Sequence, residues 1–146
     1  MRDPLAIGLG ALGSGAGIGG GTIVAALVIV RTLEHHLHAI NYEESAADPV
    51  LAGTFAGLAL AAAFGWRRSA RLDNIWQRGV IGVLSAVAAL LIGFIAWPVD
   101  RFLGTPGLVG WGVASFALGA AASAWAVRGG RPDAVDTHET EKAPRA

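Results

Sequence analysis

Four long stretches of this sequence contain no charged side chain, and this feature constrains its fold more than any other. No Asp, Glu, Lys or Arg occurs in residues 4–30, 50–66, 79–97 or 102–127. At a rise of about 1.5 Å per residue, helices of these lengths cross, or nearly cross, a hydrocarbon layer of roughly 30 Å. We therefore predict an all-α membrane protein with four transmembrane helices in an antiparallel bundle, with spans at about residues 5–30, 48–66, 79–97 and 106–127.

The composition argues against a water-soluble fold and against several classes of function. Hydrophobic residues make up 53% of the chain and charged residues only 15%, against about 25% charged in ordinary soluble domains. A soluble bundle needs a polar face on each helix, and these stretches have none. The chain contains no cysteine, which excludes disulfides and thiol chemistry, and its net charge of zero predicts no binding to nucleic acid.

The positive residues predict the orientation in the membrane, because Lys and Arg collect on the cytoplasmic side. With four spans, the two termini and the second loop share one side, and the positive residues of that side are Arg2, Arg67, Arg68, Arg71, Arg78, Arg128, Arg131, Lys142 and Arg145. The opposite side carries only Arg31 and Arg101. We therefore expect a multi-pass protein of the bacterial inner (cytoplasmic) membrane with both termini in the cytoplasm.

Two segments outside the predicted spans have patterns of their own. Leu72, Ile75, Trp76 and Gly79 recur at helical spacing, which predicts a short interfacial helix between spans two and three. Residues 129–146 mix both charges with prolines and lack apolar periodicity, which predicts a flexible, polar cytoplasmic tail. The expected organisation is thus a four-span transmembrane domain, residues 1–128, followed by this tail. The tryptophans expected at headgroup level are Trp66, Trp76, Trp97, Trp111 and Trp125.

Small residues recur every four positions along each span, a spacing that lets membrane helices approach backbone to backbone. The predicted helix-packing residues are Gly13, Gly17, Gly21, Gly53, Gly57, Gly65, Gly93 and Gly119. The glycines between Gly8 and Gly21 exceed what we expect four helices to need among themselves. This surplus predicts a partner helix, a second copy, a lipid or a flat pigment close against the first span. A plain compositional bias is the alternative.

Residues that carry chemistry are missing from the predicted spans. Ionisable groups within a membrane usually mark ion paths, proton relays or substrate sites, and the charge-free stretches 4–30, 50–66, 79–97 and 102–127 contain none. Their polar side chains are hydroxyls, such as those of Ser14, Thr22 and Ser85, which can bond back to their own helix. No nucleophile motif accompanies them. We therefore expect no proton-coupled transport and predict that the protein is not an enzyme.

A cluster at the end of the first span is the strongest candidate for a ligand site. In the sequence Glu34-His35-His36-Leu37-His38, a continued helix places Glu34 and His35 on the same face as His38. Imidazole and carboxylate groups at this spacing fit a metal ion, and one histidine fits the central metal of a tetrapyrrole beside the glycine-rich span. A pH-sensing role and a plainly hydrated helix end are the alternatives. The sequence requires no cofactor.

Together these patterns favour a non-enzymatic accessory or structural subunit that packs through its glycine-rich helix faces into a larger membrane complex. By analogy with small multi-span subunits of bioenergetic assemblies, the expected host is a photosynthetic or respiratory complex. The expected partners are the lipid bilayer and other membrane-protein subunits. The alternatives are a homo-oligomeric pore or facilitator without proton coupling, and a metal-dependent membrane enzyme that uses the outer histidine cluster.

Overall fold

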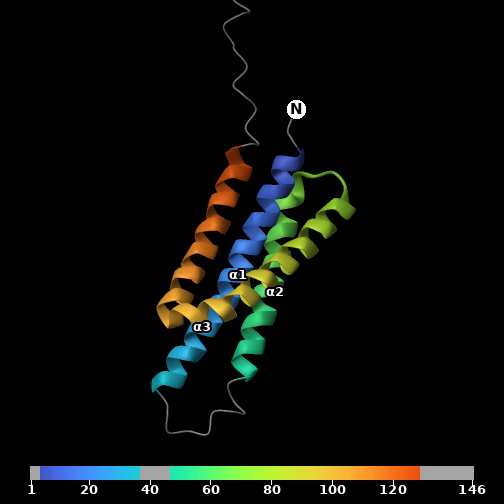
Figure 1. Cartoon of the computed structure of the whole chain (residues 1–146). Helices are drawn as coiled ribbons and strands as arrows, with labels where there is room; N and C mark the ends of the chain where they lie inside the picture. The colour runs from blue at the N-terminus through green and yellow to red at the C-terminus, as the bar shows by residue number, and fades with distance from the viewer. Residues whose placement is uncertain (1–3, 37–46, 129–146) are drawn as a thin grey trace, which may run out of the picture.

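The computed structural model describes residues 4–36 and 47–128, and within these ranges the chain is helical and contains no strand. Helix α1 spans Pro4–His36, α2 spans Ala47–Arg68, the 3-10 turn η1 spans Ser69–Arg71, and α3 spans Ile75–Arg128. The predicted all-α class is therefore confirmed. The first two predicted spans, residues 5–30 and 48–66, lie within α1 and α2 (Figure 1).

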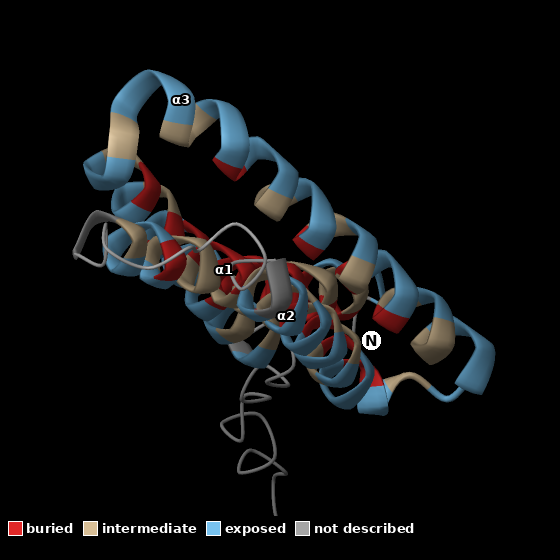
Figure 2. Ribbon diagram, turned by 90° about the horizontal axis from the view of Figure 1, so that it is seen from below, coloured by how far each residue is buried: buried red, intermediate tan, exposed pale blue. Residues whose placement is uncertain are grey.

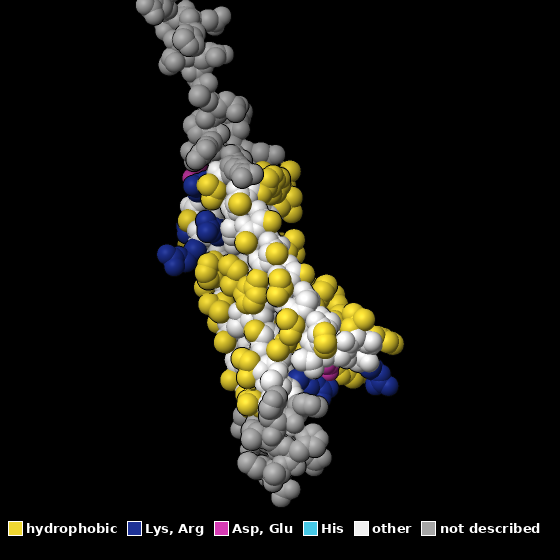
Figure 3. Space-filling view, turned by 90° about the vertical axis from the view of Figure 1, so that its left-hand side faces the viewer, with side chains coloured by type: hydrophobic (Ala, Val, Ile, Leu, Met, Phe, Trp, Pro, Cys, Tyr) yellow, Lys and Arg dark blue, Asp and Glu magenta, His cyan; other side chains and the backbone are white. Residues whose placement is uncertain are grey.

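Three helical stretches are long and apolar enough to cross a membrane: Pro4–Glu34, Pro49–Arg71 and Ile75–Val127. Large hydrophobic side chains also point outward, among them Trp76 and Phe102, which are 80% and 82% exposed. Figure 3 shows hydrophobic side chains over the middle of one face and Lys or Arg side chains toward its two ends. Soluble monomers rarely expose so much contiguous apolar surface, so these features point to a membrane protein.

The third and fourth predicted spans belong to one helical element, α3, which has 54 residues. Only Gly104 interrupts it, with φ 64° and ψ −165°, and it is the only described residue with a left-handed φ. In Figure 1, α3 turns back on itself, so that its second arm (residues 105–128, orange) returns beside α1. The prediction of four separate helices is therefore not matched: the described chain has three α-helices, and the third is bent into two arms.

The loop predicted between the last two spans is largely helical as well. Pro98, Asp100 and Arg101 all lie within α3, although proline and adjacent charges are signals for a helix end. Proline is tolerated in membrane helices because neighbouring groups satisfy the backbone that it frees. The reversal needs only one residue, Gly104, because a residue without a Cβ adopts a left-handed φ at little cost.

The predicted interfacial helix is not matched as a separate element, because Ile75, Trp76 and Gly79 belong to the first turns of α3 and Leu72 directly follows η1. Asn74 precedes this helix, and its side-chain oxygen accepts a hydrogen bond from the backbone N–H of Trp76 at 2.9 Å. This is the geometry of a helix N-cap. Ile75 and Trp76 therefore begin α3 directly, and the connection from α2 consists of η1 and three further residues.

Helix α1 is the centre of the bundle. Figure 2 shows buried positions along α1 and on the sides of the other helices that face it, whereas their outer sides are exposed. Two small buried clusters join α1 to its neighbours. The first consists of Ile23, Ala61 and Ala89, and the second of Val24, Ala96 and Leu108. Through them α1 contacts α2 and both arms of α3.

Candidate functional site

Helix α1 and the second arm of α3 contact each other at glycines, and each of the two helices contributes one of them. A Cβ placed on Gly17 would lie 2.6 Å from the carbonyl oxygen of Ser115 and 2.5 Å from the Cα of Gly119. Carbon atoms do not pack so closely, so no side chain fits at Gly17 unless a helix backbone moves. One turn earlier, a Cβ on Gly13 would lie 2.8 Å from the Cβ of Ala122. Two predicted packing residues, Gly17 and Gly119, therefore face each other.

Helices α1 and α2 form a second seam of this kind. A Cβ on Gly57 would lie 2.6 Å from the carbonyl oxygen of Gly19, and a Cβ on Gly19 would in turn meet the carbonyl oxygen of Gly57. One turn from Gly57, a Cβ on Gly53 would collide with the methyl group of Ala26. In lipid, where helices gain little from hiding apolar surface, such backbone approach supplies much of the attraction between them.

The other three predicted packing glycines face larger side chains of neighbouring helices. A Cβ would lie 2.9 Å from the ring of Phe116 at Gly21, 3.0 Å from the Cβ of Ser85 at Gly65, and 2.8 Å from the Cγ2 of Ile23 at Gly93. At Gly21 and Gly93 the missing side chain makes room for a bulky neighbour, whereas at Gly65 it makes room for the small side chain of Ser85 and for the carbonyl oxygen of Ile81, 3.3 Å from an added Cβ.

The many glycines of α1 thus have partners within the chain. From Gly10 to Gly21, a Cβ on any of these glycines would come closer than 3.0 Å to α2 or to an arm of α3. Three helical segments surround α1, so it needs small residues on several sides and not along a single stripe. This enclosure accounts for the glycine surplus within the chain, and the predicted contact of α1 with a further helix, a lipid or a pigment stays a prediction.

Hydrogen bonds between side chains join the same segments. The hydroxyl oxygens of Ser14 and Ser123 lie 2.6 Å apart and link α1 to the second arm of α3. The indole N–H of Trp111 donates to the carbonyl oxygen of Ile92 at 3.0 Å and links the two arms of α3. Ser85 bonds back to its own helix at 2.8 Å, as predicted. Trp111 is half-buried and bonded inside the bundle, and its expected place at headgroup level stays a prediction.

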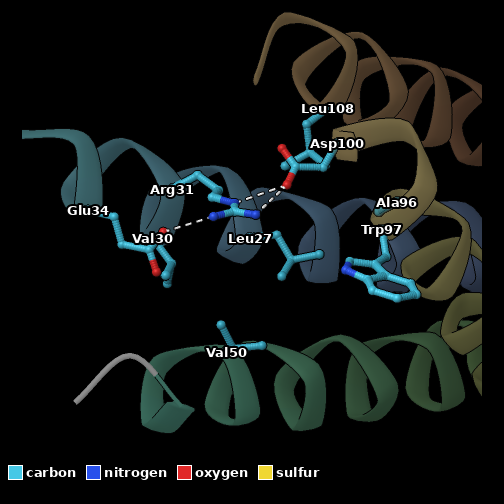
Figure 4. A pocket seen from close by; sticks show the side chains of 9 residues that line it. All are labelled: Leu27, Val30, Arg31, Glu34, Val50, Ala96, Trp97, Asp100 and Leu108. Atoms are coloured by element: carbon cyan, nitrogen blue, oxygen red, sulfur yellow. Dashed lines mark hydrogen bonds and ion pairs between the residues drawn. The ribbon is translucent and has the colours of Figure 1, made fainter. Parts of the chain in front are cut away.

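A charged cluster lies at the end of the bundle opposite the start of α1. The Nη2 and Nε of Arg31 donate to one carboxylate oxygen of Asp100 at 2.7 and 3.0 Å, and its Nη1 lies 3.2 Å from a carboxylate oxygen of Glu34. Figure 4 shows the guanidinium group between the two carboxylates, with Trp97 and Val50 across a cavity of about 310 Å³. The pair Arg31–Asp100 therefore ties α1 to α3 four residues before Gly104.

This ion pair contributes little to the free energy of unfolding. The side chain of Arg31 is 52% exposed and that of Asp100 is 15% exposed. Exposed pairs contribute about 0–1 kcal/mol because solvent screens them. The sequence offered one signal for the contact, since the predicted topology puts Arg31 and the connection that contains Asp100 on the same side, but it did not pair them.

The histidine cluster lies mostly beyond what the structure describes. Glu34 is paired with Arg31, the side chain of His35 is outside the described part, and His38 lies outside the described residues. Within residues 4–36 and 47–128, no three His, Cys, Asp or Glu side chains are grouped as a metal site requires. The proposed metal or tetrapyrrole ligands His35, His38 and Glu34 therefore stay a prediction.

Comparison with known protein families, curated proteins and solved structures gives no match for this chain.

Proposed function

We propose that this chain is a non-enzymatic integral membrane subunit with a structural, accessory role in a larger membrane assembly. The observation that carries the proposal is the enclosure of α1 by α2 and both arms of α3 at backbone distance, as at Gly17 and Gly119. Such packing excludes water and ligands from the centre of the bundle. A bundle whose interior is filled by closely packed helices is suited to a structural role and leaves no path for a substrate through its centre.

The proposed topology has four crossings, with both termini in the cytoplasm. Each arm of α3, residues 75–103 and 105–128, exceeds the roughly 20 residues that a helix needs to cross a bilayer. The reversal at Gly104 returns the chain to the end where α1 begins (Figure 1). The arginines of the second loop then lie at one end of the bundle and Arg31 and Arg101 at the other, in agreement with the positive-inside rule.

The partners of this subunit would meet its outer surface. The glycine-rich faces are filled by the chain's own helices, so the surfaces left for lipid and for other subunits carry exposed side chains such as Phe94, Phe102 and Trp76. Photosynthetic or respiratory complexes stay the proposed hosts, on the analogy with their small multi-span subunits. The bacterial inner membrane is the proposed location.

Co-purification tests this function. The full chain, carrying a carboxyl-terminal affinity tag, is extracted from its native membrane in a mild detergent and analysed by size exclusion and quantitative mass spectrometry. We expect foreign membrane subunits in a fixed ratio to this chain. As a control, the same preparation is repeated in a harsher detergent, which should release those subunits and leave this chain folded.

Two results would contradict the proposal. A pure homo-oligomer that conducts ions after reconstitution would favour the pore or facilitator. Stoichiometric zinc or iron, or a tetrapyrrole absorption band, lost in the variant His35→Ala/His38→Ala, would favour a ligand site at the outer histidine cluster.

A further inference from the structure

Three arginines line a cavity at the end of the bundle where α1 begins. Arg67 and Arg68 lie in the last turn of α2, and Arg71 ends η1. The cavity has a volume of about 190 Å³ and is also lined by Ile7 of α1 and by Ala70, Ala126 and Val127. In the described part of the chain, no acidic side chain lines this cavity, and no ion pair engages these arginines.

A fixed turn carries the three arginines. Ser69, between Arg68 and Arg71, is fully buried, and its hydroxyl donates to the carbonyl oxygen of Trp66 at 2.9 Å. Its own carbonyl oxygen accepts a hydrogen bond from the N–H of Leu72 at 2.9 Å. The backbone that presents the guanidinium groups is therefore held in one conformation, although the side chains themselves reach solvent.

The end of α2 accounts for only part of this positive charge. A helix carboxyl terminus carries about half of an elementary negative charge, which a single cation offsets. Three arginines at one cavity leave an excess of positive charge. The cavity wall opposite them is apolar, because Ile7, Ala126 and Val127 come from the ends of charge-free stretches.

A ligand that fits both walls has an anionic head and an apolar body. Guanidinium groups bind phosphate oxygens through paired, charge-assisted hydrogen bonds. We propose that this cavity binds the phosphate of an anionic phospholipid, with the glycerol and the first acyl carbons against Ile7, Ala126 and Val127. The proposed topology determines only which leaflet of the membrane supplies the lipid. Lipid binding in detergent does not depend on the topology, so the lipid site and the proposed function can each be disproved without the other.

The test uses the full chain purified in a neutral detergent, with dioleoylphosphatidylglycerol, dioleoylphosphatidylcholine and inorganic phosphate as probes. Binding is measured from the rise in thermal midpoint as each probe is titrated. We expect phosphatidylglycerol to bind more tightly than phosphatidylcholine, and inorganic phosphate to give no rise at matched concentration. Arg71→Gln should weaken the phosphatidylglycerol affinity about fivefold, and replacing all three arginines by glutamine should weaken it roughly 100-fold.

Arg101→Gln is the matched control, because Arg101 is an exposed arginine at the opposite end of the bundle. It should leave the affinity unchanged. Replacing all three arginines by lysine keeps the positive charge that sets topology but removes the paired donors of the guanidinium group. This variant should therefore bind phosphatidylglycerol with an affinity between those of the native chain and the triple glutamine variant. It also provides a test if the triple glutamine variant fails to fold. Equal losses from Arg71→Gln and Arg101→Gln, or no binding of phosphatidylglycerol, would overturn the site. An equal rise in thermal midpoint with inorganic phosphate would identify free phosphate as the ligand and contradict the proposal that a phospholipid binds here.

Discussion

Gly17 of α1 and Gly119 of α3 face each other with no room for a side chain between them. A Cβ on Gly17 would lie 2.5 Å from the Cα of Gly119, and a Cβ on Gly119 would lie 3.2 Å from the Cα of Gly17. This contact restricts the register of α1 against the returning arm of α3, because sliding that arm by one turn would bring Ser115 or Ser123 opposite Gly17. The contact therefore gives the sharpest test of the packing.

Substitution at Gly17 should destabilise the bundle, whereas the same substitution at Gly110 should not. Gly17→Ala should cost about 1–3 kcal/mol of unfolding free energy because the methyl group overpacks the seam, and Gly17→Leu should prevent folding. Gly110 is the control, since a Cβ there has nothing within 4 Å. Gly110→Ala should lie within about 1 kcal/mol of the native chain. Unfolding in mixed micelles, followed by circular dichroism, measures both. Equal stabilities for Gly17→Ala and Gly110→Ala would contradict the seam.

Substitution of Gly104 should destabilise the bundle for a different reason. The backbone dihedral angles at this residue disfavour any side chain, although the space around it is free. Its φ of 64° lies in the left-handed region, and the nearest atom to an added Cβ is 3.8 Å away. With its ψ of −165°, this is a conformation that essentially only glycine adopts. Gly104→Ala should therefore cost about 1–3 kcal/mol of unfolding free energy. Gly104→Asn should cost as much, since asparagine tolerates a positive φ mainly with ψ near +45°. Native-like stability of both variants would mean that the reversal does not depend on this conformation.

The hydroxyl pair Ser14–Ser123 should make a modest contribution. Hydrogen bonds between membrane helices average about 0.6 kcal/mol in double-mutant cycles. The single variants Ser14→Ala and Ser123→Ala and the double variant should show a coupling energy of this order. Ser115→Ala is the control, because the hydroxyl of Ser115 bonds to its own helix at 2.8 Å. Its coupling with Ser14→Ala should be close to zero, and a coupling equal to that of Ser123 would argue against a direct bond.

The ion pair Arg31–Asp100 should contribute less than about 1 kcal/mol, and high salt should weaken it. The change Arg31→Gln removes the guanidinium that both carboxylates contact. Arg101→Gln is the control, since no ion pair of Arg101 occurs in the described part of the chain. The stability difference between the two variants should shrink between low and high salt. A large loss that salt does not alter would mean that the pair is buried in the assembled protein.

The distribution of charged residues predicted where the helices lie. It did not predict the reversal of the chain, because the conformation of a single residue determines that reversal. The charge-free stretches placed α1 and α2 to within a few residues, apart from the extension of α1 to His36. The same reasoning put a loop around Asp100 and Arg101, because charges and prolines usually end a membrane span. The structure keeps these residues helical and reverses at Gly104 alone. Hydropathy carries no information about a single left-handed φ.

The packing positions were predictable, but their partners were not. A repeat of small residues shows which face of a helix allows close approach, and Gly17, Gly57 and Gly119 were identified in this way. The repeat cannot show that Gly17 meets Gly119 or that Ser14 meets Ser123, because register between helices depends on the whole set of contacts. It also gave no sign that α1 is enclosed by three segments, which is why an external partner was expected there.

Single-cysteine labelling tests most directly the proposed four-crossing topology, in which α3 folds back at Gly104. The native chain contains no cysteine, so each introduced cysteine reports alone. The labelling positions are Asp73, between η1 and α3, Thr105, at the reversal, and Thr140, in the tail. In right-side-out spheroplasts, we expect a membrane-impermeant maleimide to label Thr105→Cys. Asp73→Cys and Thr140→Cys should react only after the membrane is permeabilised. Labelling of Thr140→Cys in intact spheroplasts, or protection of Thr105→Cys there, would contradict the four-crossing topology.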